Sequence, residues 1–195
     1  LSQALRRQGW HWAHAGAVGH AQGAVLLCGP GGSGKSTSVL ACLAAGLGYL
    51  GDDYCLIRST PSPQVASLYN TAKLKTPDDA SRLPHLPPVR TKRPDGKLIY
   101  WLYPDLAVQL LDTAPLRAVV LPVITPGLTQ SYLRPCSPTQ ALRSLAPSSL
   151  LQLPGAGQTA LQGLAQVVRT LPCYELKLSP HLTQIPPLLQ TLLPT

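Results

Sequence analysis

One segment, Gly29 to Ser36, constrains the fold of this chain more than any other. It reads G-P-G-G-S-G-K-S and satisfies the pattern G-x-x-x-x-G-K-[ST]. The apolar run Ala24 to Cys28 precedes it, and a helical pattern with an apolar face follows from Lys35 to Ala45. A strand, a glycine-rich loop and a helix in this order are the context in which the pattern forms a phosphate-binding loop. The sequence therefore predicts an α/β fold built around such a loop.

The residues of this loop suit ATP bound together with Mg²⁺. Glycines allow backbone N–H groups to converge on phosphate, and the helix that follows adds the positive end of its dipole. We expect the Lys35 ammonium at the outer phosphates and the Ser36 hydroxyl at Mg²⁺. The predicted nucleotide-binding residues are Gly29, Gly31, Gly32, Ser33, Gly34, Lys35, Ser36 and Thr37.

Two adjacent acids, Asp52 and Asp53, are the best candidates for a second group associated with the metal. They follow Lys35 by 17 and 18 positions, inside the predicted strand Tyr49 to Ile57. We expect this strand to lie next to the strand that precedes the loop, with the acids at its end. One carboxylate would then meet the metal while the other takes the proton of a substrate hydroxyl. Asp112 is the alternative metal group, and a polar strand end without a role is the alternative for the pair.

His14 is a further candidate. A strand predicted over His11 to Val18 would bring His14 near the γ-phosphate or the substrate if it lay beside the strand before the loop. A histidine with a structural role is the alternative.

The rest of the chain predicts one domain over residues 1–195. Residues 59–97 are rich in Pro, Ser and basic residues, and we predict a long irregular excursion there. Further strands are predicted at Leu98 to Tyr103, Leu116 to Ile124 and Tyr174 to Leu178. Further helices are predicted at Pro138 to Leu145, Gln158 to Leu171 and Ile185 to Leu193.

The net charge is +8, and seven of the 16 basic residues fall between Lys73 and Lys97. Such a cluster suits phosphates or an acidic partner, and a solvated basic loop is the alternative. Nucleic acid is a less favoured partner, because no aromatic residues interleave the cluster and no helix-turn-helix or RRM pattern is present.

Composition also bears on location. No apolar run reaches the roughly 20 residues that span a bilayer, so we expect no membrane partner. Five cysteines without a C-x-x-C pair predict reduced thiols and a cytoplasmic protein. Because the chain contains no Met, we expect it to be part of a longer one.

Three segments in order resemble the HPr kinase/phosphorylase family and its smaller kinase relatives, including those of lasso peptide pathways. They read H-A-G-A-V (14–18), G-A-V-L-L-C-G-P-G-G-S-G-K-S-T (23–37) and G-L-G-Y-L-G-D-D-Y-C-L-I (46–57). The rest matches loosely, through a later strand and the segment Pro172 to Leu176 with the helix after it. The resemblance implies the core shared by the HPr kinase C-terminal domain and ATP-dependent phosphoenolpyruvate carboxykinase, a β-rich mixed sheet with flanking helices.

The resemblance also implies roles for single residues. Lys35 would contact the β- and γ-phosphates and Ser36 would bind Mg²⁺. Asp52 would be the general base, Asp53 would hold the metal, and His14 would lie near the transferred phosphate. The family forms oligomers, so the resemblance allows a homo-oligomer, while the sequence itself does not give the oligomeric state.

The chain departs from the family pattern at two positions. Pro30 follows the first glycine of the loop and Ala15 follows His14, where the bifunctional enzymes commonly carry acids. The second half also lacks a clear copy of the signature associated with the phosphorylase reaction. We therefore predict neither reverse phosphorolysis nor HPr as the substrate.

The sequence predicts an ATP/Mg²⁺-dependent kinase that transfers the γ-phosphoryl group to a hydroxyl, most simply a serine of a peptide or protein. Two alternatives stay open at this point. One is a small-molecule kinase with the same core, and the other is a regulatory module that binds a nucleotide with little or no turnover.

Overall fold

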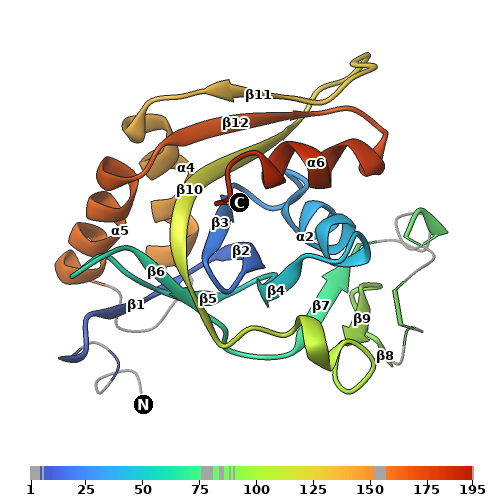
Figure 1. Ribbon diagram of the computed structural model, residues 1–195, viewed down its shortest axis with the longest axis horizontal. Coiled ribbons are helices and arrows are strands. Elements are labelled where there is room, and N and C mark those ends of the chain that lie inside the picture. Colours follow the sequence, from blue (N-terminus) through green and yellow to red (C-terminus); the bar gives the residue numbers. More distant parts are fainter. Residues whose placement is uncertain are drawn as a thin grey trace.

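The computed structural model describes residues 5, 7–75, 81–83, 86–87, 89, 91–151 and 157–194. Within these residues, a nine-stranded mixed sheet forms the centre of the molecule (Figure 1). Its main path runs β1-β5-β6-β10-β3-β2-β4, while β12 pairs with β10 and β11 pairs with β12. The strand β10 is parallel to β3 and to β12, and the other pairs are antiparallel. The strands are β1 (Trp10–Ala13), β2 (Ala15–His20), β3 (Gly23–Cys28), β4 (Gly48–Gly51), β5 (Cys55–Arg58), β6 (Gln64–Ala66), β10 (Thr113–Ile124), β11 (Tyr132–Pro135) and β12 (Cys173–Leu178).

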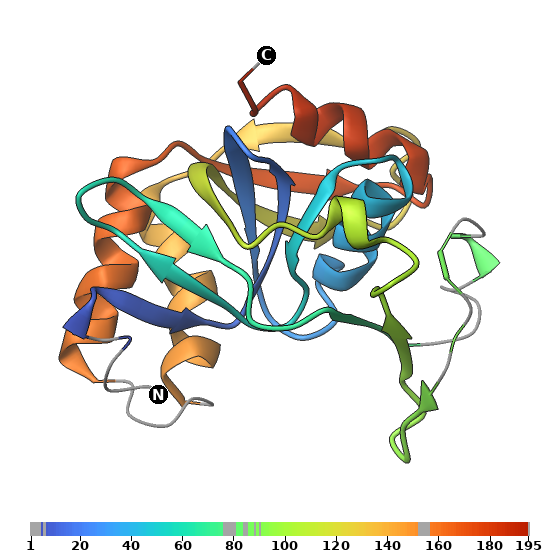
Figure 2. The same ribbon diagram turned by 60° about the horizontal axis from the view of Figure 1, so that its bottom comes forward.

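A smaller sheet and the helices complete the described structure. The small sheet has the order β7-β9-β8 and consists of β7 (Thr71–Leu74), β8 (Thr91–Lys92) and β9 (Leu98–Trp101). It lies at the opposite end of the molecule from α4 and α5 (Figure 1, Figure 2). The α-helices are α2 (Lys35–Ala44), α4 (Pro138–Leu151), α5 (Gln158–Thr170) and α6 (Ile185–Gln190), and the 3₁₀ turns are η1 (Ala107–Gln109) and η2 (Leu182–Gln184).

Two apolar clusters lie on opposite faces of the main sheet, and β3 contributes to both. Successive side chains of a strand point to opposite faces. Leu26 therefore packs in the cluster that includes α4 and α5, while Val25 and Leu27 pack in the cluster that includes α2, α6 and the small sheet. Each fully buried leucine or valine stabilises the fold by about 1.5–3 kcal/mol. The run A-V-L-L-C is apolar throughout because both of its faces are covered.

Most predicted elements are confirmed, with changes at their ends. The strand before the glycine-rich loop and the helix after it form as predicted. The strand predicted from Leu116 begins at Thr113, and the helix predicted to end at Leu145 continues to Leu151. The last helix ends at Gln190 rather than Leu193. The strand β11 was not predicted.

Three predictions are wrong. The strands predicted over His11 to Val18 and Tyr49 to Ile57 are each broken in two, at His14 and at residues 52–54. Strand β4 does not lie next to β3, because β2 pairs with both and separates them. The segment 59–97, predicted as irregular, contains β6, β7 and β8, although its residues 76–80, 84–85, 88 and 90 lie outside the described ones.

Two further features concern the helices and the cysteines. Among the described residues, no helix combines the length and apolar character that a bilayer crossing requires. All five cysteines lie in the described ranges and are unpaired, and all but Cys136 are buried.

Candidate functional site

The ends of three neighbouring strands of the main sheet, β2, β3 and β4, lie side by side. Strand β2 runs antiparallel to both of its neighbours, with Ala15 opposite Cys28 of β3 and Ala17 opposite Gly51 of β4. The beginning of β2 therefore lies beside the ends of β3 and β4. This arrangement brings together His14, the loop that starts at Gly29 and the acid pair that follows Gly51, as the sequence analysis predicted for the loop and the acids.

The glycine-rich loop (Gly29–Ser36) turns sharply into α2. Gly34, the residue before α2, has a φ of 102° in the left-handed region. A Cβ atom there would lie 2.6 Å from Cδ1 of Leu178, so both backbone and packing require glycine. Gly32 also has a positive φ, of 82°, whereas Gly31 does not.

Lys35 is the first residue of α2, and its side chain folds back over the loop. Its ammonium donates hydrogen bonds to the carbonyl oxygens of Gly29, at 2.6 Å, and of Pro30, at 3.1 Å. Burial lowers the pKa of Lys35, and the nearby Asp53 carboxylate opposes this effect. The ammonium is therefore positioned beside the loop, where it can bind phosphate.

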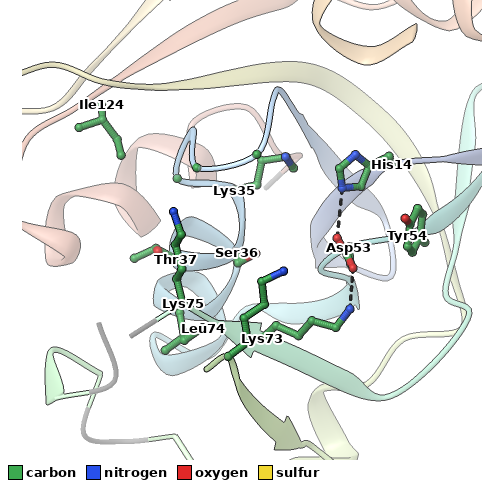
Figure 3. A pocket seen from close by; sticks show the side chains of 14 residues that line it. His14, Lys35, Ser36, Thr37, Asp53, Tyr54, Lys73, Leu74, Lys75 and Ile124 are labelled. Atoms are coloured by element: carbon green, nitrogen blue, oxygen red, sulfur yellow. Dashed lines mark hydrogen bonds and ion pairs between the residues drawn. The ribbon is translucent and has the colours of Figure 1, made fainter. Parts of the chain in front are cut away.

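A cavity of about 610 Å³ opens over the loop (Figure 3), within the roughly 300–1,000 Å³ typical of small-molecule sites. We call its two sides the loop wall and the acid–lysine wall. The loop wall consists of Gly31, Gly32, Gly34, Lys35, Ser36 and Thr37. The acid–lysine wall consists of His14, Asp53, Lys73, Lys75 and Lys97. Tyr54, Leu74 and Ile124 also line the cavity.

Most, but not all, of the site residues predicted from the sequence line this cavity. Eight of them line the cavity, whereas Gly29, Ser33 and Asp52 do not. Asp112, the alternative metal group, is exposed and does not line the cavity. Its backbone carbonyl oxygen accepts a hydrogen bond from the N–H of Ser67. Lys73, Lys75 and Lys97 were not assigned to the site from the sequence. The only signal for them was the basic cluster between Lys73 and Lys97.

Asp53 is the acid that faces the cavity. Its Oδ1 lies 3.1 Å from Nε2 of His14, and its Oδ2 accepts a hydrogen bond of 2.6 Å from Nζ of Lys73 (Figure 3). Burial by itself would raise the pKa of Asp53. The hydrogen bonds from His14 and Lys73 outweigh burial and hold this pKa well below its usual range. Asp53 is therefore ionised and paired with two potential cations.

Asp52 has the opposite environment, with an exposed fraction of 1%. Its Oδ2 accepts a hydrogen bond of 2.7 Å from the backbone N–H of Lys73, while its buried Oδ1 has no hydrogen-bond partner. Burial raises the pKa of Asp52 to about 6, although the nearby Ser36 hydroxyl and the Lys73 N–H act to lower it. Lys73 thus contacts both acids, one through its backbone and the other through its ammonium.

His14 is held by α4 as well as by Asp53. Because the strand is interrupted at His14, its backbone N–H does not join the sheet ladder and donates instead to Oγ of Ser149, at 2.9 Å. The His14 ring packs against the ring of Tyr54, with centroids 5.2 Å apart. These contacts fix the imidazole beside the acid pair.

The residues at the loop fit a magnesium ion. Mg²⁺ in nucleotide sites takes few protein ligands, commonly one hydroxyl and one or two carboxylates, together with phosphate oxygens and water. Here the Ser36 hydroxyl lies near the Asp52 carboxyl, which carries an unpartnered oxygen, and Asp53 is ionised close by. The described residues contain no group of three or more His, Cys, Asp or Glu side chains able to form a metal cage without a ligand.

Comparisons with known proteins give a fold but no close relative. No protein-family model matches the sequence, and no curated protein matches it. Among solved structures, the HPr(Ser) kinase/phosphatase from Coxiella burnetii is similar with a TM-score of 0.50 and 12% sequence identity, over 93% of each chain. At this identity the likeness shows the fold alone. The β-rich mixed sheet with flanking helices that the family resemblance implied is confirmed at this level.

Proposed function

We propose that this chain is an ATP- and Mg²⁺-dependent kinase that transfers the γ-phosphoryl group to a hydroxyl, namely a serine of a peptide or protein. One observation carries the proposal: a single cavity has Lys35 and Ser36 on one wall and Asp53 with His14 on the other. Phosphoryl transfer depends mainly on positioning and on charge stabilisation, and these two walls supply cations, a hydroxyl and a carboxylate around one space.

On the loop wall, the residues Gly31 to Thr37 would hold the phosphates. The N–H groups at the beginning of α2 favour an anion, and the Lys35 ammonium would exchange its bonds to the Gly29 and Pro30 carbonyls for bonds to the outer phosphates. Ser36 and Asp53 would hold Mg²⁺, which neutralises charge on the phosphates when bound. Asp53 would then exchange its bond to Lys73 for the metal.

Next to the acid–lysine wall, Asp52 would act as the general base. A base is most effective when its pKa lies near the working pH, and burial raises the pKa of Asp52 to about 6. Its Oδ1 has no partner and is available to accept the proton of the hydroxyl. Because Asp52 is only 1% exposed, this role requires substrate binding to open a path to it. The reverse assignment has Asp53 as the base and Asp52 at the metal, and it is favoured because Asp53 lines the cavity. The pH dependence of phosphoryl transfer distinguishes the two assignments.

The proposal is tested by incubating the protein with ATP, Mg²⁺ and a set of serine-containing peptides and detecting phosphopeptides by mass spectrometry. Asp52→Asn should slow transfer by about 100-fold or more while ATP binding is retained. Asp112→Asn is the matched control, because it makes the same change at an exposed acid outside the cavity. Transfer by Asp52→Asn at nearly the unchanged rate would refute the assignment of the base. Tight ATP binding without transfer to any peptide would favour the regulatory module.

A further inference from the structure

The small sheet has one face that is turned away from the apolar cluster containing α2. Ala72 and Leu74 of β7, with Leu98 and Tyr100 of β9, are buried in the apolar cluster that contains α2. The alternate residues must point to the other side. The strand register pairs Lys73 with Ile99, Thr71 with Trp101 and Thr91 with Ile99. We call this side, together with Lys75 and Lys97 at its end, the outer face of the small sheet.

The outer face is continuous with the cavity. Lys73, Lys75 and Lys97 belong to the acid–lysine wall, so the end of the face that carries the lysines is the mouth of the proposed active site. From there the face runs along β9 to Trp101, whose exposed fraction is 50%. Four residue steps of a strand cover about 13 Å, which is the length of about four residues of an extended peptide.

The cavity contains more lysines than are needed to contact a nucleotide and the acid pair. Four lysines line it, Lys35, Lys73, Lys75 and Lys97, against the single carboxylate of Asp53. In the proposed function Lys35 binds the phosphates, and Lys73 forms an ion pair with Asp53. Nζ of Lys97 lies 3.5 Å from Oδ2 of Asp95, but both side chains are more than two-fifths exposed, so water screens this pair. Lys75 is exposed and makes no ion pair within the described residues.

We propose that the outer face of the small sheet docks the acceptor, as an extended acidic peptide segment. Its acidic side chains, next to the acceptor serine, would lie against Lys75 and Lys97, and an apolar side chain about four residues further along would pack on Trp101. The inference rests on the proposed kinase function and adds a substrate class to it. Charge complementarity selects the acidic peptide, and the half-exposed indole selects the apolar residue.

Three variants isolate the face. Lys75→Glu combined with Lys97→Glu reverses the charge at the mouth of the cavity, and Trp101→Ala removes the apolar contact. Lys92→Glu is the matched control: Lys92 is exposed on the same small sheet, but it pairs with Leu98 and therefore alternates to the other side of β8. All three variants change side chains at the surface, where substitutions usually alter stability little.

The probe is a fluorescein-labelled peptide with glutamates on both sides of a serine and a leucine four residues after it. Its binding to the protein is measured by fluorescence anisotropy with Mg²⁺ and ADP present, beside a peptide in which lysines replace the glutamates. We expect the acidic peptide to bind at least tenfold more tightly than the basic one. The double charge reversal should weaken it at least tenfold, Trp101→Ala several-fold, and Lys92→Glu less than twofold. Raising the salt concentration should weaken binding.

The outcomes separate the docking surface from the kinase function. If the acidic peptide binds as expected but is not phosphorylated when ATP replaces ADP, the docking proposal is supported and the kinase proposal is refuted. If peptides are phosphorylated and their KM is unchanged in the double variant and in Trp101→Ala, the kinase stands and the docking surface is refuted. Equal binding of the acidic and basic peptides, or tighter binding of a single-stranded oligothymidine that the double variant abolishes, would also refute it.

Discussion

The two walls of the cavity are built in different ways. The loop wall comes from one continuous stretch, Gly31 to Thr37, whose geometry is encoded locally by its glycines and by the beginning of α2. The acid–lysine wall collects side chains from β7 and the residue after it, from the breaks after β1 and β4, and from the residue before β9. The loop wall can therefore be recognised as a motif. The acid–lysine wall exists only once the strands have paired, and its lysines are the groups that we propose contact the acceptor.

Lys35→Met gives the largest expected effect on ATP binding and tests the difference between the walls directly. Loss of the ammonium removes charge-assisted hydrogen bonds worth about 1.5–3 kcal/mol each, so ATP should bind about 10–100-fold more weakly. Lys75→Met is the matched control on the acid–lysine wall, and ATP affinity should change less than about threefold. Calorimetry measures both. Equal losses in the two variants would show that the nucleotide uses both walls.

The adjacent acids should contribute to stability with opposite dependence on pH. The folded state holds the Asp52 proton more tightly than the unfolded state, because burial raises this pKa from 3.8 to about 6. The ionised carboxylate therefore costs stability, and this cost grows as pH rises through the window from about 4 to 6. Relative to Asp52→Asn, the unchanged protein should lose about 2 kcal/mol of unfolding free energy between pH 4.5 and 7.5, measured by urea denaturation.

The variant Asp53→Asn tests the other acid in the same way. The pKa of Asp53 is lowered in the folded state, so its contribution to stability is present above the unfolded pKa and is lost only as pH falls below it. The destabilisation of Asp53→Asn should accordingly persist at pH 7.5 and decline below about pH 4. If both variants showed the same dependence on pH, the two carboxyls would not have the different environments described above.

The pH dependence of phosphoryl transfer identifies which of the two acids is the base. If Asp52 with its pKa of about 6 takes the proton, kcat/KM should fall about tenfold per pH unit below pH 6 and be level above it. A base with the lowered pKa of Asp53 would leave the rate level down to pH 5. ATP affinity, measured over the same pH range, shows whether the loss lies in catalysis or in binding.

The loop side of the site could be predicted from sequence because its information is local. The G-x-x-x-x-G-K-[ST] pattern, the apolar run before it and the helical pattern after it each specify structure over a few residues. The acid pair was placed correctly at this edge for a partly wrong reason. It lies there because β2 pairs with β4, and not because β4 adjoins the strand before the loop.

The remainder depends on contacts between distant residues. Lys73 is one of many basic residues in the sequence, and its contact with both acids follows from the position of β7 beside Asp52. The short strands β6 and β7 lie in a segment rich in proline and serine, and their few apolar residues form no periodic pattern long enough to identify. The break at His14 is likewise a product of the fold, since its N–H is satisfied by Ser149 on α4.

The long strand β10 has a consequence for the order in which this chain acquires function. It supplies the parallel neighbour of β3, with Leu116 opposite Ala24 and Val120 opposite Leu27, and β12 then pairs with β10. The glycine-rich loop is thus complete early in synthesis, and the strand before it can pair with β2, but this strand gains its second partner only after residue 120 has left the ribosome. Contacts of such sequence separation form slowly. A nascent or truncated chain ending before β10 would contain the loop, the acids and Lys73, and yet lack the support that holds them in one site.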